Sequence, residues 1–381
     1  MTRTEDPAFL EFAITQVAVA AGMSRDHAGY IADAIVFAHF QGKLNQGLGV
    51  YEAIDIALLN DVLDVTAVPE CISEGPAFAV FDGKRSSGYY TLNLMADKAI
   101  EKARDTGISI VFGGNHNDAG SFGRYVYKAY EAGLVGIASN NTVPLAAPYG
   151  GMANVLSCPP FDAMVPSQNQ PPIWASLMFA EWYDAHTSEA VLTNKPLDGK
   201  WLIDPETGAL SDNVSKYARP IEGYGRVWDS SAAGQLASPR TYALNLWNEA
   251  LTALVNPIGI PAHQLPTIQD FEEGRGRPSV GGSYFIAIDP SVFGPFGEFL
   301  RKTDDFVAAV KSTLPRPGHS VRMPGEPGFN RLQTEHARVE VLEHHWRPFF
   351  DTIAGRYHLT EQALRDSFAE QPGIGATHSE K

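Results

Sequence analysis

The stretch from Ile108 to Gly151 constrains the fold of this chain more than any other. An apolar run over residues 108–112 predicts a buried strand, which Gly113 ends. A polar loop and an amphipathic helix follow, and residues 134–138 predict a second strand that ends in the polar loop 139–142. Because loops at strand ends leave side chains and backbone groups unpaired, this pattern indicates a ligand site in an α/β protein.

Composition narrows the class of protein further. A chain of 381 residues with 44% hydrophobic residues can bury a substantial core, as one large domain or two. The formal net charge of -15 argues against a nucleic-acid binder or a protein of anionic membranes. Cys71 and Cys158 are too few for a disulfide framework and lack metal-ligand spacing. No apolar run approaches the roughly 20 residues that span a bilayer. The N-terminus lacks the basic and apolar parts of a signal peptide, so we expect a cytoplasmic protein.

Hydrophobic periodicity predicts helices along much of the remaining chain. The predicted helices cover residues 7–21, 25–41, 49–60, 89–106, 176–192, 240–255, 297–314 and 333–368. Short strands are predicted at residues 78–81, within 152–175 and at 283–288. The turn-rich residues 194–237 are expected to form loops.

His116 and Asp118 form the best local pair of chemical groups. Residues two apart in an extended loop point the same way, so an imidazole and a carboxylate would share one pocket and move a proton. The alternative is that Asp118 caps the following helix. His344 and His345 lie among acidic residues in a late helix, where we expect them to be solvated. No Rossmann glycine fingerprint, P-loop or zinc-protease motif is present.

Several segments in the same order resemble the type-2, non-Rossmann malate/L-lactate dehydrogenase family, which includes ureidoglycolate and sulfolactate dehydrogenases and cyclic-imino-acid reductases. The segments that carry the resemblance are EAGLVGIASNNTVPLAAPYGG (131–151), KPLDGKW and DPETG (195–208), YFIAIDPSVFG (284–294) and PGEP (324–327). The resemblance covers roughly residues 5–360.

The resemblance implies a sulfolactate dehydrogenase-like α/β fold with a non-Rossmann nicotinamide-binding domain and helical N- and C-terminal parts. On this basis residues 81–296 form the nicotinamide-binding domain, residues 1–80 with 297–370 form a helical domain on the substrate side, and residues 371–381 form a disordered tail. Family members are typically homodimers that transfer hydride between NAD(P)H and a 2-oxo or cyclic imino acid. A homodimer, a small-molecule substrate and NAD or NADP are therefore implied.

The family's active-site loops are altered in this chain. Its first loop carries a Ser-His-Gly followed by an arginine, and the matching residues here are Asn45, Gln46, Gly47 and Val50. Its second loop ends in His-Phe-Gly, where this chain has Asp118 in place of the histidine. The resemblance thus implies Asn45, Gln46 and Asp118 as catalytic positions, with His116 beside them as the only histidine of either loop.

Cofactor and substrate positions also follow from the resemblance. The family's Asp-Met-Ala-Thr-Ser segment corresponds to residues 176–180, and an apparent insertion near 222–237 precedes its Lys-Gly-Tyr-Gly helix start. The implied cofactor-binding residues are Gly120, Gly123, Asn140, Thr142, Pro144, Ser157, Ser176, Ala180, His186 and Arg240. The implied substrate-binding residues are Lys43, Val50 and Tyr149.

These replacements change the expected chemistry. Reduction of a carbonyl or imine needs a proton donor, and histidine suits that role because its pKa lies near 7. Gln46 does not titrate, and the pKa of Asp118 must be raised before it acts near neutrality. Replacement of the arginine by Val50 removes a charged hydrogen bond worth about 1.5–3 kcal/mol. A plain 2-oxo acid should then bind poorly unless Lys43, Arg124 or Arg240 substitutes.

Three hypotheses remain open at this stage. The first is an NAD(P)-dependent oxidoreductase whose ketone, hydroxy or cyclic imine substrate lacks the usual carboxylate clamp. The second is a non-redox lyase, hydratase or isomerase that uses Asp118 and His116 as acid and base. The third is a binding protein without catalysis. A fold by itself does not decide among them.

Overall fold

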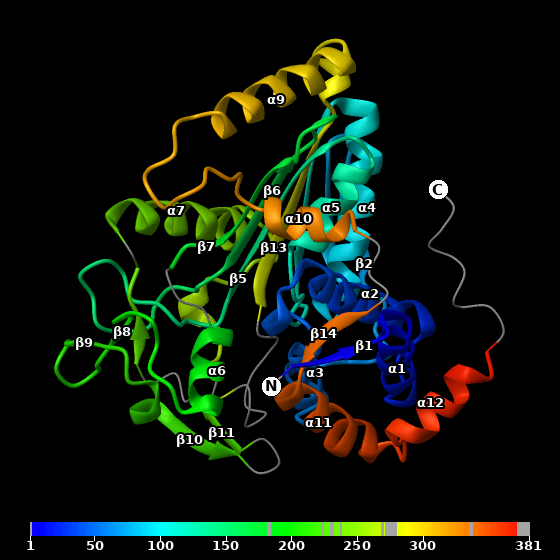
Figure 1. Ribbon diagram of the computed structural model, residues 1–381, viewed down its shortest axis with the longest axis vertical. Coiled ribbons are helices and arrows are strands. Elements are labelled where there is room, and N and C mark those ends of the chain that lie inside the picture. The colour runs from blue at the N-terminus through cyan, green and yellow to red at the C-terminus, as the bar shows by residue number, and fades with distance from the viewer. Residues whose placement is uncertain are drawn as a thin grey trace.

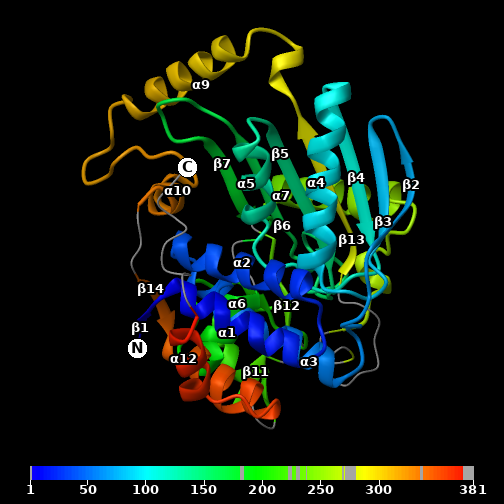
Figure 2. The same ribbon diagram turned by 90° about the vertical axis from the view of Figure 1, so that its right-hand side faces the viewer.

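The structure, a computed structural model, describes residues 2–180, 184–221, 225–228, 232–236, 238–267, 270, 280–334 and 338–371. A central sheet stands above a helical layer in which the first and last parts of the chain lie side by side (Figures 1 and 2). Among the described helices, none is long and apolar enough to cross a membrane. Cys71 and Cys158 are free thiols.

Seven strands form the central sheet, in the order β2-β3-β4-β13-β5-β6-β7. They are β2 (Glu70–Gly75), β3 (Phe78–Asp82), β4 (Ile108–Gly114), β5 (Val135–Thr142), β6 (Pro160–Val165), β7 (Ile173–Met178) and β13 (Val280–Ile288). β3 and β4 are parallel, and the other neighbouring pairs are antiparallel. Both strands predicted within residues 108–151 are confirmed, and β13 lies between them.

Helices cover the sheet and build the layer below it. The α-helices are α1 (Pro7–Ala20), α2 (Arg25–Gln41), α3 (Tyr51–Leu59), α4 (Gly88–Thr106), α5 (Gly123–Glu131), α6 (Asp184–Thr193), α7 (Pro239–Glu249), α9 (Phe296–Lys311), α10 (Glu326–Leu332), α11 (Glu343–Arg347) and α12 (Glu361–Ala369). The π-helical turns are η4 (Ala250–Val255), which continues α7, and η7 (Pro348–Ala354), which continues α11. The 3-10 helices are η1 (Leu44–Gln46), η2 (Leu48–Val50), η3 (Val214–Tyr217), η5 (Ala262–Gln264) and η6 (Pro290–Val292).

The two faces of the sheet carry different helices. Successive side chains of a strand point to opposite faces. Val111 and Phe285 belong to the core that α4 and α5 cover. Phe112 and Tyr284, their chain neighbours, pack with Leu251 of η4 on the other face. The sheet is therefore covered on both sides where β4, β13 and β5 meet.

The helical layer joins both ends of the chain. Its core combines residues of α1, α2 and α3 with residues of α11, η7 and α12. The N-terminal strand β1 (Thr2–Glu5) pairs antiparallel with β14 (Val339–Leu342). Ser24 caps α2 as predicted, by accepting a hydrogen bond from the backbone N–H of His27.

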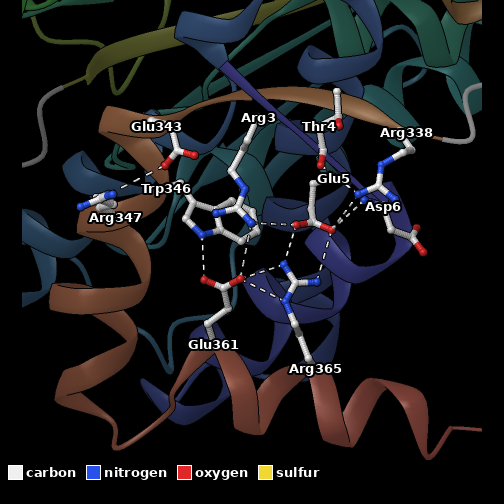
Figure 3. A network of polar contacts seen from close by, with 10 residues as sticks. All are labelled: Arg3, Thr4, Glu5, Asp6, Arg338, Glu343, Trp346, Arg347, Glu361 and Arg365. Atoms are coloured by element: carbon white, nitrogen blue, oxygen red, sulfur yellow. Dashed lines mark hydrogen bonds and ion pairs between the residues drawn. The ribbon is translucent and has the colours of Figure 1, made fainter. Parts of the chain in front are cut away.

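A charged network fastens the first strand to the last helices (Figure 3). The carboxylate of Glu5 is buried and accepts a hydrogen bond of 2.5 Å from Arg365, which also bonds Glu361. The guanidinium of Arg3 lies 3.9 Å from the centre of the Trp346 ring. Burial alone would raise the pKa of Glu5, but the bonds from Arg365 and from the Asp6 N–H outweigh it and hold the pKa below its usual value.

Short strands replace part of the loop predicted over residues 194–237. They are β8 (Leu202–Ile203), β9 (Leu210–Ser211), β10 (Ala218–Ile221), β11 (Gly225–Trp228) and β12 (Ala233–Gly234). Strands β12, β8 and β9 form one small sheet, and β10 and β11 form another. Of the apparent insertion near 222–237, residues 222–224, 229–231 and 237 lie outside the described residues, as does the predicted tail from residue 372 onwards.

The predictions for helices 7–21, 25–41, 49–60 and 89–106 are confirmed, whereas three later predictions are wrong in part. Residues 176–178 are not helical, because they continue β7 and pair with β6. Residues 339–342 interrupt the helix predicted over 333–368, because β14 pairs with β1. Residues 139–142 are not a loop, because their backbone pairs with β13. In each case a partner strand distant in sequence determines the backbone conformation.

Candidate active site

A buried polar seam lies where helix α7 meets the ends of β4 and β5. We define this polar seam by residues Asn140, Asn141, Ser157, Asn245, Asn248, Glu249 and Asn256. Nδ2 of Asn248 donates to the backbone oxygen of Asn140 at 2.9 Å, and Nδ2 of Asn256 donates to that of Gly113 at 2.8 Å. These bonds hold α7 to β5, and the residue that follows η4 to β4, although β13 separates the two strands.

Glu249 is the centre of the polar seam. Its carboxylate accepts hydrogen bonds from Nδ2 of Asn141 at 3.1 Å, Oγ of Ser157 at 3.3 Å and the backbone N–H of Ala262 at 2.6 Å. Nδ2 of Asn245 donates to the backbone oxygen of Ser157 at 3.0 Å. Hydrogen bonds from several donors offset the cost of burying a carboxyl group. Glu249 therefore fixes the relative positions of α7, β5 and the segment before β6.

The sequence contained a signal for the polar seam that the prediction did not use. Asn245, Asn248, Glu249 and Thr252 recur at helical spacing and are buried. The apolar stripe of the same helix points outward, with Leu244, Trp247 and Leu254 exposed by 55%, 66% and 69%. A prediction that places the apolar stripe of every helix in the core is wrong for α7, because the polar stripe of α7 faces the sheet.

The side-chain oxygen of Asn140 differs from the other acceptors of the polar seam that are described above. The residue is 1% exposed, and Oδ1 has no hydrogen-bond partner among the described residues. A buried acceptor without a donor costs free energy, about 1–3 kcal/mol. Its backbone oxygen is bonded to Asn248, so only the side-chain oxygen remains for a ligand donor.

Asp118 lies in the loop between β4 and α5. It does not cap α5, whose N-cap is Phe122 without a side-chain bond; instead its Oδ2 accepts from the backbone N–H of Gly120 at 3.1 Å. Burial raises the pKa of Asp118, opposed by hydrogen bonds from the Gly120 and Ala119 N–H groups. The residue as a whole is half-buried, so it combines a raised pKa with partial access to solvent. This combination suits a group that exchanges a proton.

His116 faces a different set of partners. It is fully buried, and its Nε2 lies 2.9 Å from Oγ of Ser283 while Nδ1 lies 2.7 Å from the backbone oxygen of Asn117. Burial lowers its pKa to about 4. Since Nδ1 donates to a carbonyl, Nε2 accepts from the serine hydroxyl. The structure thus holds His116 neutral with both nitrogens occupied, and does not bond it to Asp118.

Lys43, a predicted substrate-binding residue, contacts the strands β6 and β7. Its Nζ donates to Oγ of Ser176 at 2.8 Å. Asp162 lies directly opposite Ser176 in the β6–β7 pair and accepts a bond of 2.9 Å from Nε1 of Trp174. Burial raises the pKa of Asp162, against the opposing effects of Lys43, Ser176 and Trp174. The carboxyl group of Asp162 therefore lies opposite Ser176, the position at which the resemblance implies an aspartate in the family.

The first loop, which we define as residues 42–50, lies between helices α6 and α11. Nδ2 of Asn45 donates to Oε2 of Glu189 on α6 at 2.6 Å. Gln46 and Val50 are half-buried, and Val50 packs against the core of the helical layer. Glu189 was not among the predicted site residues, and only its spatial contact with Asn45 reveals it.

The two predicted glycines make close contacts. A Cβ on Gly120, whose φ is +60°, would lie 2.6 Å from the Tyr89 hydroxyl. A Cβ on Gly123 would lie 2.9 Å from the Trp174 ring. Both glycines permit an approach that a side chain would block.

The other predicted residues are scattered. Thr142, Pro144, Ala180 and His186 are half-buried, and burial lowers the pKa of His186. Tyr149 and Arg240 are exposed. The structure therefore gathers Asn140 and Ser157 in the polar seam, and Lys43 with Ser176 beside Asp162, but leaves Tyr149 and Arg240 at the surface.

Comparison with known proteins gives one consistent family. A sequence model described as malate/L-lactate dehydrogenase matches residues 6–348. A malate dehydrogenase of Pyrococcus horikoshii is 25% identical over 335 residues, which are 84% of this chain and 86% of that protein.

Solved structures agree with the predicted fold class. The sulfolactate dehydrogenase of Methanocaldococcus jannaschii superposes with a TM-score of 0.81 at 22% identity, covering 96% of this chain and 99% of that chain. The delta1-piperideine-2-carboxylate reductase of Pseudomonas syringae superposes with a TM-score of 0.78 at 18% identity, covering 91% and 98%. The sulfolactate dehydrogenase-like α/β fold is confirmed.

Proposed function

The chain belongs to the malate/L-lactate dehydrogenase family, and from this premise we propose that it is an oxidoreductase that uses NAD or NADP. The substrate is a non-standard ketone, hydroxy compound or cyclic imine that lacks the carboxylate clamped by the family arginine. The observation that carries this proposal is the contrast at the two loops. The polar seam near the second loop keeps its asparagine and glutamate hydrogen bonds and leaves Oδ1 of Asn140 for a ligand, whereas Val50 and Gln46 replace the charged groups of the first loop.

The residues of the polar seam fit a nicotinamide group. Oδ1 of Asn140 is a buried acceptor without a donor in the part of the chain that the structure describes, and a carboxamide N–H supplies such a donor. Asn140 and Thr142 belong to the last three residues of β5, and Pro144 comes two residues after the strand. Ser157, another residue of the polar seam, is buried. A bound nicotinamide would supply the hydride. The exposed Arg240 in the first turn of α7 is available to a phosphate.

Asp118 is the residue that we assign to the reacting heteroatom. It stands at the position of the family's second histidine, burial raises its pKa, and it remains partly exposed. His116 has a supporting role, because its hydrogen bond to Ser283 ties the second loop to β13. This assignment gives proton transfer to the carboxyl group of Asp118 alone, and not to the pair of Asp118 and His116.

A homodimer is part of the proposal. Leu244, Trp247 and Leu254 expose an apolar stripe on α7 and η4, and Phe293 is 73% exposed before α9. Exposed apolar patches of this kind mark interaction surfaces. A second copy of the chain is the occupant we assign, because the resemblance implies homodimers.

The test is an equilibrium titration with NADH and NADPH, followed by absorbance assays of nicotinamide oxidation with a panel of ketones and cyclic imines. We expect saturable binding of at least one dinucleotide and oxidation by some members of the panel. Absence of binding up to millimolar concentrations contradicts the proposal. Substrate conversion without nicotinamide oxidation supports the lyase, hydratase or isomerase hypothesis, and binding without any conversion supports the non-catalytic one.

A further inference from the structure

The charge presented by the first loop differs in sign from the family pattern. A histidine and an arginine at these positions give way to Gln46 and Val50, neither of which carries a charge. In their place the loop contacts an acid, because Asn45 donates its 2.6 Å hydrogen bond to Oε2 of Glu189. Glu189 is half-buried on α6, the helix that packs against η1.

The half-buried His186 and His344 lie within the electrostatic reach of Glu189, and burial lowers the pKa of both more than nearby carboxylates raise it. Two of the nearby basic side chains, Lys43 and Arg124, bond other groups. Lys43 points to Ser176 at 2.8 Å and its charge lies beside the buried carboxyl of Asp162. Nε of Arg124 donates to Oδ2 of Asp33 at 2.6 Å. Arg124 is therefore paired with a carboxylate of α2, and Lys43 bonds the hydroxyl of Ser176 near the carboxyl group of Asp162.

Three histidines surround the loop: His39, His344 and His345, which we call the histidine cluster. Gly47 packs directly on the ring of His39, and a Cβ on Gly49 would lie 2.6 Å from Nε2 of His345. Nε2 of His39 accepts from the N–H of Leu48 at 2.9 Å, so Nδ1 carries the proton and donates to the backbone oxygen of Glu340 at 2.8 Å. His39 is therefore fixed as a neutral structural group.

The other two histidines are neutral as well. The rings of His344 and His345 meet edge to face with centroids 4.5 Å apart, and each has a buried nitrogen without a partner among the described residues. Burial lowers the pKa of His345 to about 3 and lowers that of His344, against the opposing effect of Glu189. The earlier prediction that this pair is solvated is wrong in part, because both residues are half-buried and each has one buried ring nitrogen. Among the described residues, no set of three or more His, Cys, Asp or Glu is arranged to hold a metal ion.

We propose that Glu189, held by Asn45, recognises a cationic nitrogen, and that the substrate is a protonated cyclic imine without an adjacent carboxylate. This inference rests on the proposed function and names the substrate class of the same site. A carboxylate attracts the iminium N–H through a charge-assisted hydrogen bond, whereas it repels a 2-oxo acid.

The reaction balances without a histidine. The iminium carbon accepts hydride from the reduced nicotinamide, and the π electron pair of the C=N bond moves onto nitrogen. The products are a neutral amine and oxidised nicotinamide, and the amine then takes a proton from water. Because the substrate nitrogen brings its own proton, the reduction needs no histidine in either loop. One substrate class thus explains Gln46, Asp118 and Val50 together.

The experiment compares matched substrates on the full-length enzyme. Initial rates of NADH or NADPH oxidation are measured with delta1-piperideine, with delta1-piperideine-2-carboxylate and with a 2-oxo acid. We expect delta1-piperideine to have the highest kcat/KM. We also expect that value to fall as pH rises through the pKa of the imine itself, and to shift when an imine of different basicity is used.

Two variants test the residue assignment. Glu189→Gln keeps the size of the side chain and removes its charge, and we expect KM for the imine to rise about tenfold to a hundredfold with a smaller change in kcat. Glu101→Gln, on the exposed side of α4, is the matched control and should leave KM unchanged. Val50→Arg should shift the preference toward the carboxylate-bearing imine, with dinucleotide affinity as the check that the variant folds.

The outcomes separate this inference from the proposed function. Absence of dinucleotide binding by the unmodified protein contradicts the proposed function. Intact dinucleotide binding with a preference for the carboxylate-bearing imine or the 2-oxo acid overturns the inference alone. The inference is also overturned if the protein binds a dinucleotide but converts no cyclic imine, or if KM for the imine is unchanged in Glu189→Gln.

Discussion

The polar seam and the first loop are the two regions whose comparison is most informative. In the polar seam, asparagine and glutamate side chains bond across α7, β5 and the strand β4, and their partners are mostly backbone groups. In the first loop, side chains contact other side chains, such as Asn45 with Glu189 and Lys43 with Ser176. A side chain that bonds a backbone group is needed to satisfy that group, which is present whatever the sequence. Two side chains that bond each other can both be replaced without leaving a backbone group unpaired.

This difference explains which family features this chain keeps. A change in the polar seam leaves buried groups unpaired and destabilises the sheet. A change of Asn45 or Gln46, which do not belong to the hydrophobic core of the helical layer, alters the polar groups of the first loop at little cost to the fold. Under the proposed function, the polar seam on the cofactor side is therefore constrained by stability, and the first loop on the substrate side is free to diverge.

The largest effect is expected from Glu249→Ala. Three donors, on Asn141, Ser157 and Ala262, would lose their acceptor in a buried site. We expect the free energy of unfolding to fall by about 3 kcal/mol or more, measured by urea denaturation. Asn45→Ala, in the first loop, is the contrasting variant and should cost less than about 1 kcal/mol. Equal losses in both variants would remove the distinction between the two regions.

The next effect concerns catalysis at the second loop. Asp118→Asn keeps the hydrogen bond from the Gly120 N–H but removes the charge. We expect kcat/KM for a ketone, whose oxygen needs a proton from the enzyme, to fall about a hundredfold, which is typical of a lost acid–base group. The value for a protonated cyclic imine should change less, and dinucleotide affinity should stay unchanged. Steady-state kinetics and calorimetry measure the two quantities. A variant that retains full activity shows that Asp118 has no part in the reaction.

Acid should destabilise both regions through their buried histidines. Burial holds the pKa of His116, beside the polar seam, and of His39, beside the first loop, at about 4, below the usual value of 6.5. The unfolded chain binds these protons first, so the stabilising contribution is complete above pH 6.5 and is lost as pH falls toward 4. Each group contributes a slope of at most about 1.4 kcal/mol per pH unit. Urea midpoints between pH 7 and pH 4.5 measure it, and pH-independent midpoints contradict it.

A smaller effect is expected at the ends of the chain. The pKa of Glu5 is held below its usual value, so its ion pairs with Arg365 and Arg3 stabilise the fold at neutral pH and lose that effect as pH falls through the lowered pKa (Figure 3). Glu5→Gln should lower thermal stability by a few degrees at pH 7. The difference from the unmodified protein should vanish at strongly acidic pH. A difference that grows in acid contradicts this assignment.

Local patterns predicted much of the fold because they act within one element. The spacing of apolar residues gave the first four helices, and Ser24 marked the start of α2. The pairing of β14 with β1 and the insertion of β13 between β4 and β5 were not predictable, because those partners are distant in the chain.

The candidate site shows the same limit. Asp118 was identifiable from its place between a strand and a helix, but the buried state of His116 depends on Ser283, which is 167 residues away. Glu189 and the histidine cluster become visible only when α6 and α11 pack on the first loop. Helix α7 was misleading because its polar stripe, and not its apolar stripe, faces the sheet.

The most direct test of the account is one fluorescence titration of the unmodified protein with NADH and NADPH, followed by addition of a 2-oxo acid to the saturated sample. The account predicts saturation by at least one dinucleotide at submillimolar concentration and no oxidation of the bound nicotinamide by the 2-oxo acid. Absence of binding up to millimolar concentrations would show that the cofactor side is not retained. Rapid oxidation by the 2-oxo acid would show that the substrate side has not changed.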